Sequence, residues 1–483
     1  MTWREKTILD DITLLVLLGA ALTAAVWAAG HALLHKRDPR SALVWVSLSL
    51  TLPVMGALLY WLLGINRITR RAHHWHKSGR RLGFQELYPP AVAQPPALPP
   101  LFQGLHNLEI LSDRIVRTRN HASNRLFPLK NGEEAYPAML AAIDAASHSI
   151  HLCSYIFDGD RIGGAFVNSL AAAVKRGVVV RVIVDAMGER YSAVTARAAL
   201  LGSGVDIRHY LPLYKGPFIN LRNHRKLLLV DGRVAFTGGM NIRSNHCVEI
   251  AGLLHAASDL HFQVQGPVVN DLQRIFLEDW YFVSGQRLDD QAYFPLLDAG
   301  GTALVRAIAD GPDREFRKLE WIVMGALSTA KQRVRIMTPY FIPDRPMVTA
   351  LVTAALRGVE ITLVLPQQNN LPFVAWASRA SYWELIKNGI QILEQPPPFA
   401  HTKLLLVDDL WSLIGSANLD TRSFRLNFEL NLSVYDQQFA AVLNEHFDAI
   451  QAGSYLISLQ EMDSRPLAIK LRDGAARLFT PYL

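Results

Sequence analysis

The chain has 483 residues, of which 50% are hydrophobic and 19% charged, and its formal net charge is +7. This length and apolar content predict two or three folded domains and exclude disorder throughout. The two cysteines exclude a disulfide scaffold and a zinc site with four cysteine ligands. The net charge leaves nucleic acid, an anionic membrane or no charged partner open.

The positive charge is concentrated at the start of the chain. Residues 1–100 contain eleven Lys and Arg against five Asp and Glu, whereas residues 101–483 contain thirty-eight against thirty-seven. The larger part of the chain is therefore nearly neutral, which disfavours a nucleic-acid groove there.

Two apolar runs, residues 12–34 and 41–65, contain no Asp, Glu, Lys or Arg. As a helix, each run is long enough to cross about 30 Å of hydrocarbon. A cleaved signal peptide is the alternative for the first run, but the second run follows so closely that a transmembrane hairpin over residues 1–66 is favoured. Eight basic residues in the two outer flanks of these runs, against three in the turn between them, predict that the rest of the chain is cytoplasmic.

Residues 67–104 are predicted to link this hairpin to a folded body. Their first part is basic and includes His73, His74 and His76, which we interpret as an interfacial segment rather than a metal site. Residues 88–100 contain six prolines and predict a semi-rigid, extended spacer.

The body contains an internal repeat of alternating helices and strands. In the first copy we predict helices at 136–146, 161–176 (capped by Asp160) and 192–202, and strands at 149–156, 178–184 and 205–210. In the second copy we predict helices at 316–330, 345–357 and 372–388, and strands at 333–337, 360–365 and 390–393. This alternation predicts an α/β fold with a mixed, largely parallel sheet covered by helices. The duplication predicts two lobes, residues 105–300 and 301–483, related by a pseudo-twofold axis.

Each copy ends in the pattern H-x-K-x₄-D, followed by a glycine and an asparagine at matching offsets. The residues are His224, Lys226, Asp231, Gly238 and Asn241 in the first copy, and His401, Lys403, Asp408, Gly415 and Asn418 in the second. Two matching patterns at equivalent places in a repeat are far less probable by chance than one. Alternate residues of a strand share a face, so each His and Lys should emerge together. A twofold axis would then bring both pairs into one cleft.

These residue types suit the chemistry of a phosphodiester without a metal. Lysine and asparagine donate to the non-bridging oxygens and stabilise a five-coordinate phosphorus. One neutral imidazole can attack phosphorus, and a protonated one can give its proton to the leaving alcohol and later deprotonate the incoming one. Two histidines in these roles predict a bell-shaped dependence of rate on pH. No motif for a metal or a nucleotide accompanies them, and we expect no cofactor.

The paired motifs resemble those of the phospholipase D superfamily, and nearly the whole chain is similar to bacterial cardiolipin synthases with two N-terminal membrane spans. The similarity includes residues 36–42, 222–226, 259–261, 265–267 and 338–341. It implies a catalytic set of His224, Lys226, Asp231, His401, Lys403 and Asp408, within which we expect both aspartates to be structural. It further implies that His224 is the nucleophile and His401 the general acid and base, although the symmetry of the repeat leaves this order open.

The resemblance also assigns supporting residues. Glu429 would orient His224, Asp259 would orient His401, and Asn241 and Asn418 would bind the phosphate. One departure is that Gly239 of the first copy stands where the second has Ser416, which leaves no hydroxyl there.

The implied reaction moves the phosphatidyl group of one phosphatidylglycerol onto a histidine, and then onto a second phosphatidylglycerol, at the inner membrane of a bacterium. The implied partners are phosphatidylglycerol and anionic membrane lipid, with no nucleic acid. A hydrolytic phospholipase D, a phosphatidyltransferase that uses phosphatidylethanolamine, a phosphodiester nuclease and a non-enzymatic membrane scaffold are the alternatives.

Overall fold

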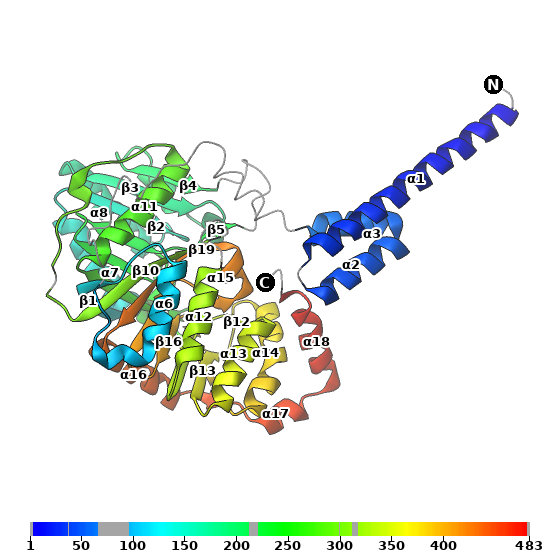
Figure 1. Cartoon of the computed structure of the whole chain (residues 1–483). Helices are drawn as coiled ribbons and strands as arrows, with labels where there is room; N and C mark the ends of the chain where they lie inside the picture. Colours follow the sequence, from blue (N-terminus) through cyan, green and yellow to red (C-terminus); the bar gives the residue numbers. More distant parts are fainter. Residues whose placement is uncertain are drawn as a thin grey trace. The chain divides into compact units, whose positions relative to one another are not determined.

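The computed structural model describes residues 3–36, 38–65, 96–211, 221–298, 300–311 and 317–480, which form two units, residues 1–81 and 82–483 (Figure 1). The histidines at positions 73, 74 and 76 and most of the proline-rich spacer lie outside the described residues.

The first unit is helical. α1 (Trp3–His35) packs against α2 (Pro39–Thr51) and α3 (Pro53–Leu59), which is followed by the π-helical turn η1 (Tyr60–Gly64). Asp38 caps α2 by accepting a hydrogen bond from the backbone of Ser41 over 3.0 Å. His31, near the C-terminal end of α1, bonds to the hydroxyl of Tyr60 over 2.7 Å, which ties α1 to the start of η1.

The expected continuous helix over residues 41–65 is divided. Pro53 has no N–H to donate to Ser49, and the helix is interrupted at Leu52 before it resumes as α3. Among the described residues, one helix is long and apolar enough to cross a membrane, Ile12–His35, with a mean hydropathy of 2.2.

The second unit is built on a mixed sheet of 16 strands, in which the two copies contribute the same spatial order. The first copy supplies β4 (Asp206–Tyr210), β3 (Val179–Asp185), β2 (Ser149–Ser154), β6 (Leu227–Val230), β7 (Val234–Gly238), β9 (Leu260–Gln265) and β1 (His121–Lys130). The second supplies β14 (Gln391–Gln395), β13 (Glu360–Pro366), β11 (Arg333–Met337), β16 (Leu404–Val407), β17 (Trp411–Gly415), β19 (Asn427–Tyr435) and β10 (Ala303–Asp310), with β20 (Tyr455–Leu456) outside β14. The sixteenth strand, β5 (Arg222–Asn223), pairs with β19 outside this order. β1 and β10 pair antiparallel and join the two series.

The expectation of a largely parallel sheet is wrong. Parallel pairing joins β2, β3 and β4 in one copy and β11, β13 and β14 in the other, while most remaining pairs are antiparallel. The motif strands account for part of this difference. β6 and β16 each return directly through a tight turn, at residues 231–233 and 408–410, and so form hairpins with β7 and β17.

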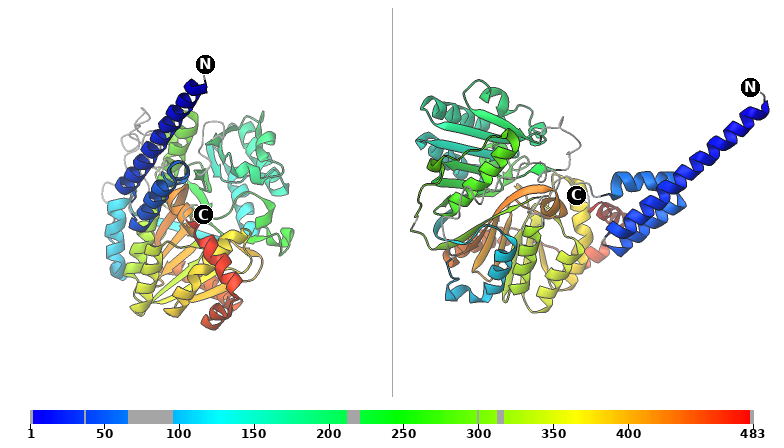
Figure 2. Two further views of the ribbon diagram at one scale, coloured as in Figure 1. Left: turned by 90° about the vertical axis from the view of Figure 1, so that its right-hand side faces the viewer. Right: turned by 45° about the horizontal axis from the view of Figure 1, so that its top comes forward.

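Helices cover the sheet (Figures 1 and 2). In the first copy they are α7 (Asn131–Ala145), α8 (Arg161–Lys175) and α11 (Val268–Ser284), and in the second α12 (Lys318–Thr329), α13 (Arg345–Leu356), α14 (Pro372–Lys387) and α16 (Gln437–Ala452). Asp160 caps α8 as expected. The helix predicted at 192–202 is shorter, because only α9 (Ala196–Leu200) is helical there. α6 (His106–Ile115), which precedes the first copy, packs against α12 of the second.

Candidate active site

His224 is held by a two-residue strand that pairs with the other copy. β5 (Arg222–Asn223) runs parallel to the start of β19. The backbone N–H of His224 continues the pairing by donating to the carbonyl of Phe428 over 2.9 Å. The next residue of β19 is Glu429, whose Oε2 lies 3.0 Å from Nδ1 of His224. A histidine of the first copy thus contacts a carboxylate of the second.

His401 is held in the same way with the copies exchanged. β15 (Phe399–Ala400) runs parallel to β8 (Ala257–Ser258). The backbone N–H of His401 donates to the carbonyl of Ser258 over 2.8 Å. The residue after β8 is Asp259, and its Oδ2 lies 2.6 Å from Nδ1 of His401. Both imidazoles therefore meet their carboxylate through Nδ1, which leaves Nε2 for chemistry.

The residues on either side of His224 are fixed by buried ionic contacts. The backbone of Asn223 donates to Asp185 over 2.9 Å, and its side-chain amide donates to Asp279 of α11 over 3.2 Å. Arg225 donates to the same Asp279 over 2.7 Å. These side chains are all at most 7% exposed. Buried, fully paired groups of this kind restrict a histidine to one orientation.

Both motif lysines are buried beside the histidines. Lys226 Nζ donates to the carbonyl of His224 over 2.6 Å, and Lys403 Nζ lies 3.0 Å from Nδ1 of His401. Burial lowers the pKa of Lys226 to about 7 and that of Lys403 to about 8. The site therefore contains two ammonium groups that can lose their charge near neutral pH.

The two histidines and their lysines lie within electrostatic reach of one another. Burial is the main cause that lowers the pKa of His401 well below its usual value, and the charges of Lys403, Lys226 and His224 add to it. Burial also lowers the pKa of His224, and Glu429 only partly opposes this. Both imidazoles are thus mainly neutral at pH 7, as a nucleophilic histidine requires.

The two asparagines of the repeat are buried at equivalent positions. Asn241 accepts a hydrogen bond through Oδ1 from the backbone of Ile156 over 3.2 Å. Oδ1 of Asn418 has no hydrogen-bond partner among the described residues. The motif glycines that precede them, Gly238 and Gly415, have φ of 152° and 150°. A Cβ at Gly415 would lie 2.1 Å from Oδ1 of Asn431, so glycine is required there.

Asp231 and Asp408 follow the motif strands at the ends remote from the lysines. Asp231 accepts hydrogen bonds from the backbone of residues 147–149 over 2.8–2.9 Å. Asp408 accepts the equivalent bonds from residues 331–333 over 2.8–3.0 Å. Each carboxylate thus fastens the turn after its motif strand to the start of β2 or β11.

The copies differ in what supports each carboxylate. Ser416 donates its hydroxyl hydrogen to Oε2 of Glu429 over 2.6 Å and accepts from the backbone of Leu430 over 3.0 Å. The equivalent Gly239 has no room for a side chain, because a Cβ there would lie 2.4 Å from Oδ2 of Asp259. The first copy therefore lacks this hydroxyl because any side chain at position 239 would clash with Asp259.

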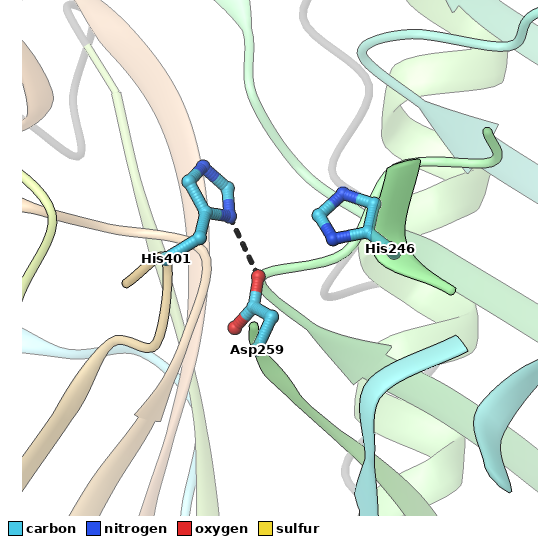
Figure 3. Close-up of side chains that lie close together, drawn as sticks. All are labelled: His246, Asp259 and His401. Atoms are coloured by element: carbon cyan, nitrogen blue, oxygen red, sulfur yellow. Dashed lines mark hydrogen bonds and ion pairs between the residues drawn. The ribbon is translucent and has the colours of Figure 1, made fainter. Parts of the chain in front are cut away.

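His246 is a buried histidine that the sequence analysis did not identify. Asp259 lies between His246 and His401, and the three ligand atoms are within 4.8 Å of one another (Figure 3). The backbone N–H of Asn241 donates to Nε2 of His246 over 3.3 Å, so the proton of the neutral ring is on Nδ1. A ring in this state has no free lone pair for a metal. The cluster of His246, Asp259 and His401 therefore does not fit a metal ion while Asn241 donates to His246.

The offset within the repeat could have revealed His246. It stands 22 residues after His224, and Ser423 stands 22 residues after His401. Ser423 Oγ accepts from the backbone of Asn418 over 3.2 Å, as His246 accepts from Asn241. Extending the comparison of the copies past the asparagines would have shown a histidine opposite a serine.

Comparison with known proteins identifies the family of this chain. A family model described as "Cardiolipin synthase, PLD-like domain" matches residues 139–280 and 323–451, and one described as "Phospholipase D-nuclease N-terminal" matches residues 23–64. A cardiolipin synthase of Geobacillus kaustophilus (strain HTA426) is 32% identical over 467 residues, which covers 93% of this chain and 90% of the relative. Cardiolipin synthase 1 of Staphylococcus epidermidis (strain RP62A) is 30% identical over 468 residues, 93% of each chain.

A solved structure shows the same fold at low identity. The phosphatidylserine synthase of Haemophilus influenzae Rd KW20 aligns with a TM-score of 0.61 at 14% identity, over 78% of this chain and all of that one. Because the family model matches more than half of the chain and the relatives match nearly all of it, the chain belongs to the cardiolipin synthase family, whose domains are phospholipase D-like.

Proposed function

We propose that this protein makes cardiolipin by moving the phosphatidyl group of one phosphatidylglycerol onto the hydroxyl of another, with release of glycerol. The observation that carries the proposal is the crossed arrangement of the two motifs. Each motif histidine contacts a carboxylate of the other copy through Nδ1, and both lysines lie beside them. The names of the relatives support the same product, cardiolipin.

In the first step, Nε2 of neutral His224 attacks phosphorus and the bond from phosphorus to the glycerol oxygen breaks. His401, protonated at Nε2, gives its proton to that oxygen, so glycerol leaves as an alcohol. His401 is mainly neutral in the free protein. An anionic phosphodiester between the lysines would raise its pKa and allow it to carry this proton.

In the second step, His401 takes the proton of a terminal hydroxyl of the second phosphatidylglycerol. The hydroxyl oxygen attacks phosphorus, the bond to His224 breaks, and cardiolipin forms. Glu429 and Asp259 hold the two rings and favour their positive charge. Lys226, Lys403, Asn241 and Asn418 would donate to the non-bridging oxygens. Exchanging the roles of the two histidines gives the same products, and trapping of the phosphorylated histidine distinguishes the two orders.

The remaining parts of the chain have supporting roles in this proposal. Asp231 and Asp408 are structural, since they fasten turns to strands. Residues 1–66 would cross the inner membrane of a bacterium twice, with α1 as one span and residues 41–65 as the other. The body would then lie on the cytoplasmic side, with the two motif-bearing lobes at residues 105–300 and 301–483 following the linker at 67–104. Anionic lipid at that surface would be the substrate.

The test is the purified full chain in detergent with phosphatidylglycerol as the only lipid, with products read by mass. Cardiolipin and glycerol in equal amounts are expected, and addition of phosphatidylethanolamine should not change the product. Phosphatidic acid alone would instead show a hydrolase. His224→Ala and His401→Ala should both abolish turnover, and full activity in both would refute the site. Acid-labile label from radioactive phosphatidylglycerol on His224 supports the nucleophile assignment, and label on His401 reverses it.

A further inference from the structure

The C-terminal helix carries an apolar stripe on its outer face. α18 (Leu467–Arg477) exposes Leu467 by 71% and Leu471 by 64%, and Leu478, directly after the helix, is 78% exposed. Residues four positions apart lie one turn apart on the same face, and Leu478 continues the stripe seven residues after Leu471. An amphipathic helix on a soluble body normally turns such a stripe inward.

The opposite face of α18 is firmly attached to the body. α18 packs along α14 (Figures 1 and 2), and Asp473 is 1% exposed and paired with Arg465 over 2.9 Å and with Arg472 over 2.7 Å. Arg472 also lies over the ring of Trp376 in α14, 4.5 Å from its centre. The exposed leucines therefore do not result from a detached helix, because the buried face is fully occupied.

The stripe continues onto neighbouring elements. Phe479 is 52% exposed and its ring lies 5.5 Å from that of Phe373, at the start of α14. Leu371, before α14, is also 47% exposed. We call this set the C-terminal apolar surface: Leu371, Phe373, Leu467, Leu471, Leu478 and Phe479. Its extent exceeds the single exposed hydrophobic residues that are normal on proteins.

Two basic residues flank this stripe, and the surface ends beside the segment that follows Asn418. Lys470 and Arg477 are exposed on α18 next to the stripe, and Lys470 Nζ makes one bond, to the carbonyl of Asp463 over 2.7 Å. The carbonyl of Thr480 accepts a hydrogen bond from Thr421 over 2.7 Å, three residues after Asn418. The surface thus ends next to the element that follows the second motif.

We propose that the C-terminal apolar surface docks into the interface of an anionic lipid bilayer. Apolar side chains in a stripe with flanking basic residues are the pattern by which helices lie in the headgroup region. The basic residues match anionic headgroups, and α1, which is long enough to cross a membrane, keeps the chain at a bilayer. This inference rests on the proposed function, because it brings the element that follows Asn418 towards the surface that contains the substrate.

A depth measurement on the full chain tests the surface directly. Leu471→Cys is labelled with an environment-sensitive fluorophore and the protein is placed in nanodiscs of phosphatidylglycerol and phosphatidylcholine. Cys153 and Cys247 are buried, and unsubstituted protein gives the background labelling. Leu356→Cys on α13, 72% exposed, is the matched control. We expect a blue shift, and strong quenching by lipids brominated in their chains, at position 471 but not at 356, with stronger quenching when phosphatidylglycerol is present.

Two outcomes overturn the proposal. One is equal, weak quenching at both positions. The other is a blue shift at 471 in detergent that grows with protein concentration, which would show a second copy on this surface instead. Because the readout is fluorescence, it remains valid even if the protein makes no cardiolipin.

A kinetic test separates docking from chemistry. The variant Leu471→Glu with Leu478→Glu should lose at least about tenfold in activity on phosphatidylglycerol in nanodiscs. Its turnover of short-chain phosphatidylglycerol dispersed as monomers should equal that of unsubstituted protein. Leu356→Glu should change neither rate. Equal rates of the double variant and unsubstituted protein on nanodiscs, or an equal loss on both substrates, overturn the proposal, whereas no turnover by unsubstituted protein overturns only the proposed function.

Discussion

Gly239 offers a direct test of how Asp259 positions His401. In the variant Gly239→Ala, the new Cβ would lie 2.4 Å from Oδ2 and 2.5 Å from Oδ1 of Asp259, where ordinary contacts begin near 3.4 Å. The carboxylate must therefore move by about 1 Å. Its Oδ2 lies 2.6 Å from His401, so this shift carries the pair beyond hydrogen-bond distance.

The size of the effect follows from the bond that is lost. A hydrogen bond between charged groups contributes about 1.5–3 kcal/mol. If the bond forms fully in the transition state, its loss lowers kcat/KM about 10- to 150-fold. Gly164→Ala is the matched control, because a Cβ at Gly164 in α8 has no atom within 4 Å. That control should retain full activity and gain about 0.5–1 kcal/mol of stability from better helix propensity.

The assay compares two leaving groups. Phosphatidylglycerol releases glycerol, which needs a proton, whereas phosphatidyl-p-nitrophenol releases a phenolate that does not. If Asp259 acts through the acid His401, Gly239→Ala should slow release of glycerol far more than the burst of p-nitrophenol. Wild-type kcat/KM on phosphatidylglycerol in a folded Gly239→Ala protein would refute the reasoning.

Three further predictions concern neighbouring groups. Lys226→Arg should move the alkaline limb of the kcat/KM profile, expected near pH 7–8, to higher pH. Burial lowers the pKa of the lysine to about 7, whereas arginine stays charged. An alkaline limb that does not move contradicts a role for this charge. Asp231→Ala should lower the free energy of unfolding by about 1.5–3 kcal/mol in urea titrations, with the turnover of folded protein unchanged, whereas turnover lost without destabilisation would make Asp231 catalytic. Burial raises the pKa of Asp259, and Lys403 and His246 only partly oppose this, so His246→Phe should move the acidic limb to higher pH; an identical profile contradicts this.

The repeat predicted most elements but not the direction of pairing. Strand 333–337 matches β11, and helix 345–357 ends one residue from α13. Alternating hydrophobic periods determine such elements locally. The expectation of a largely parallel sheet was wrong in part because of the tight turns that begin at Asp231 and Asp408. Both aspartates have positive φ, and the turns produce hairpins that the rule for alternating elements does not predict. The break in the helix before Pro53 was missed for a similar reason, since the hydropathy of residues 41–65 does not depend on whether a backbone N–H is present.

In the candidate site, too, local features could be predicted from the sequence, whereas contacts between distant residues could not. Spacing along the chain is enough to find His224 and His401, because a repeated motif is a local property. The cross-copy strands β5 and β15 are two residues long, too short for any periodic signal. The roles suggested for Glu429 and Asp259 came from family resemblance, and their contacts depend on pairing between residues more than 140 positions apart.

The crossed pairing has a consequence for the reaction. Each histidine contacts a carboxylate of the other copy, so neither copy by itself contains a complete pair of histidine and carboxylate. The short parallel strand pairs that hold the two histidines are equivalent in the two copies. The proposed roles of the histidines are not equivalent, because one imidazole must bond to phosphorus while the other moves a proton. The difference must therefore come from side chains next to the carboxylates. There, Glu429 accepts a hydrogen bond from the hydroxyl of Ser416, whereas Asp259 has Gly239 against it and His246 beside it. Exchanging these neighbours should change which histidine performs which step more readily than any change in the shared scaffold.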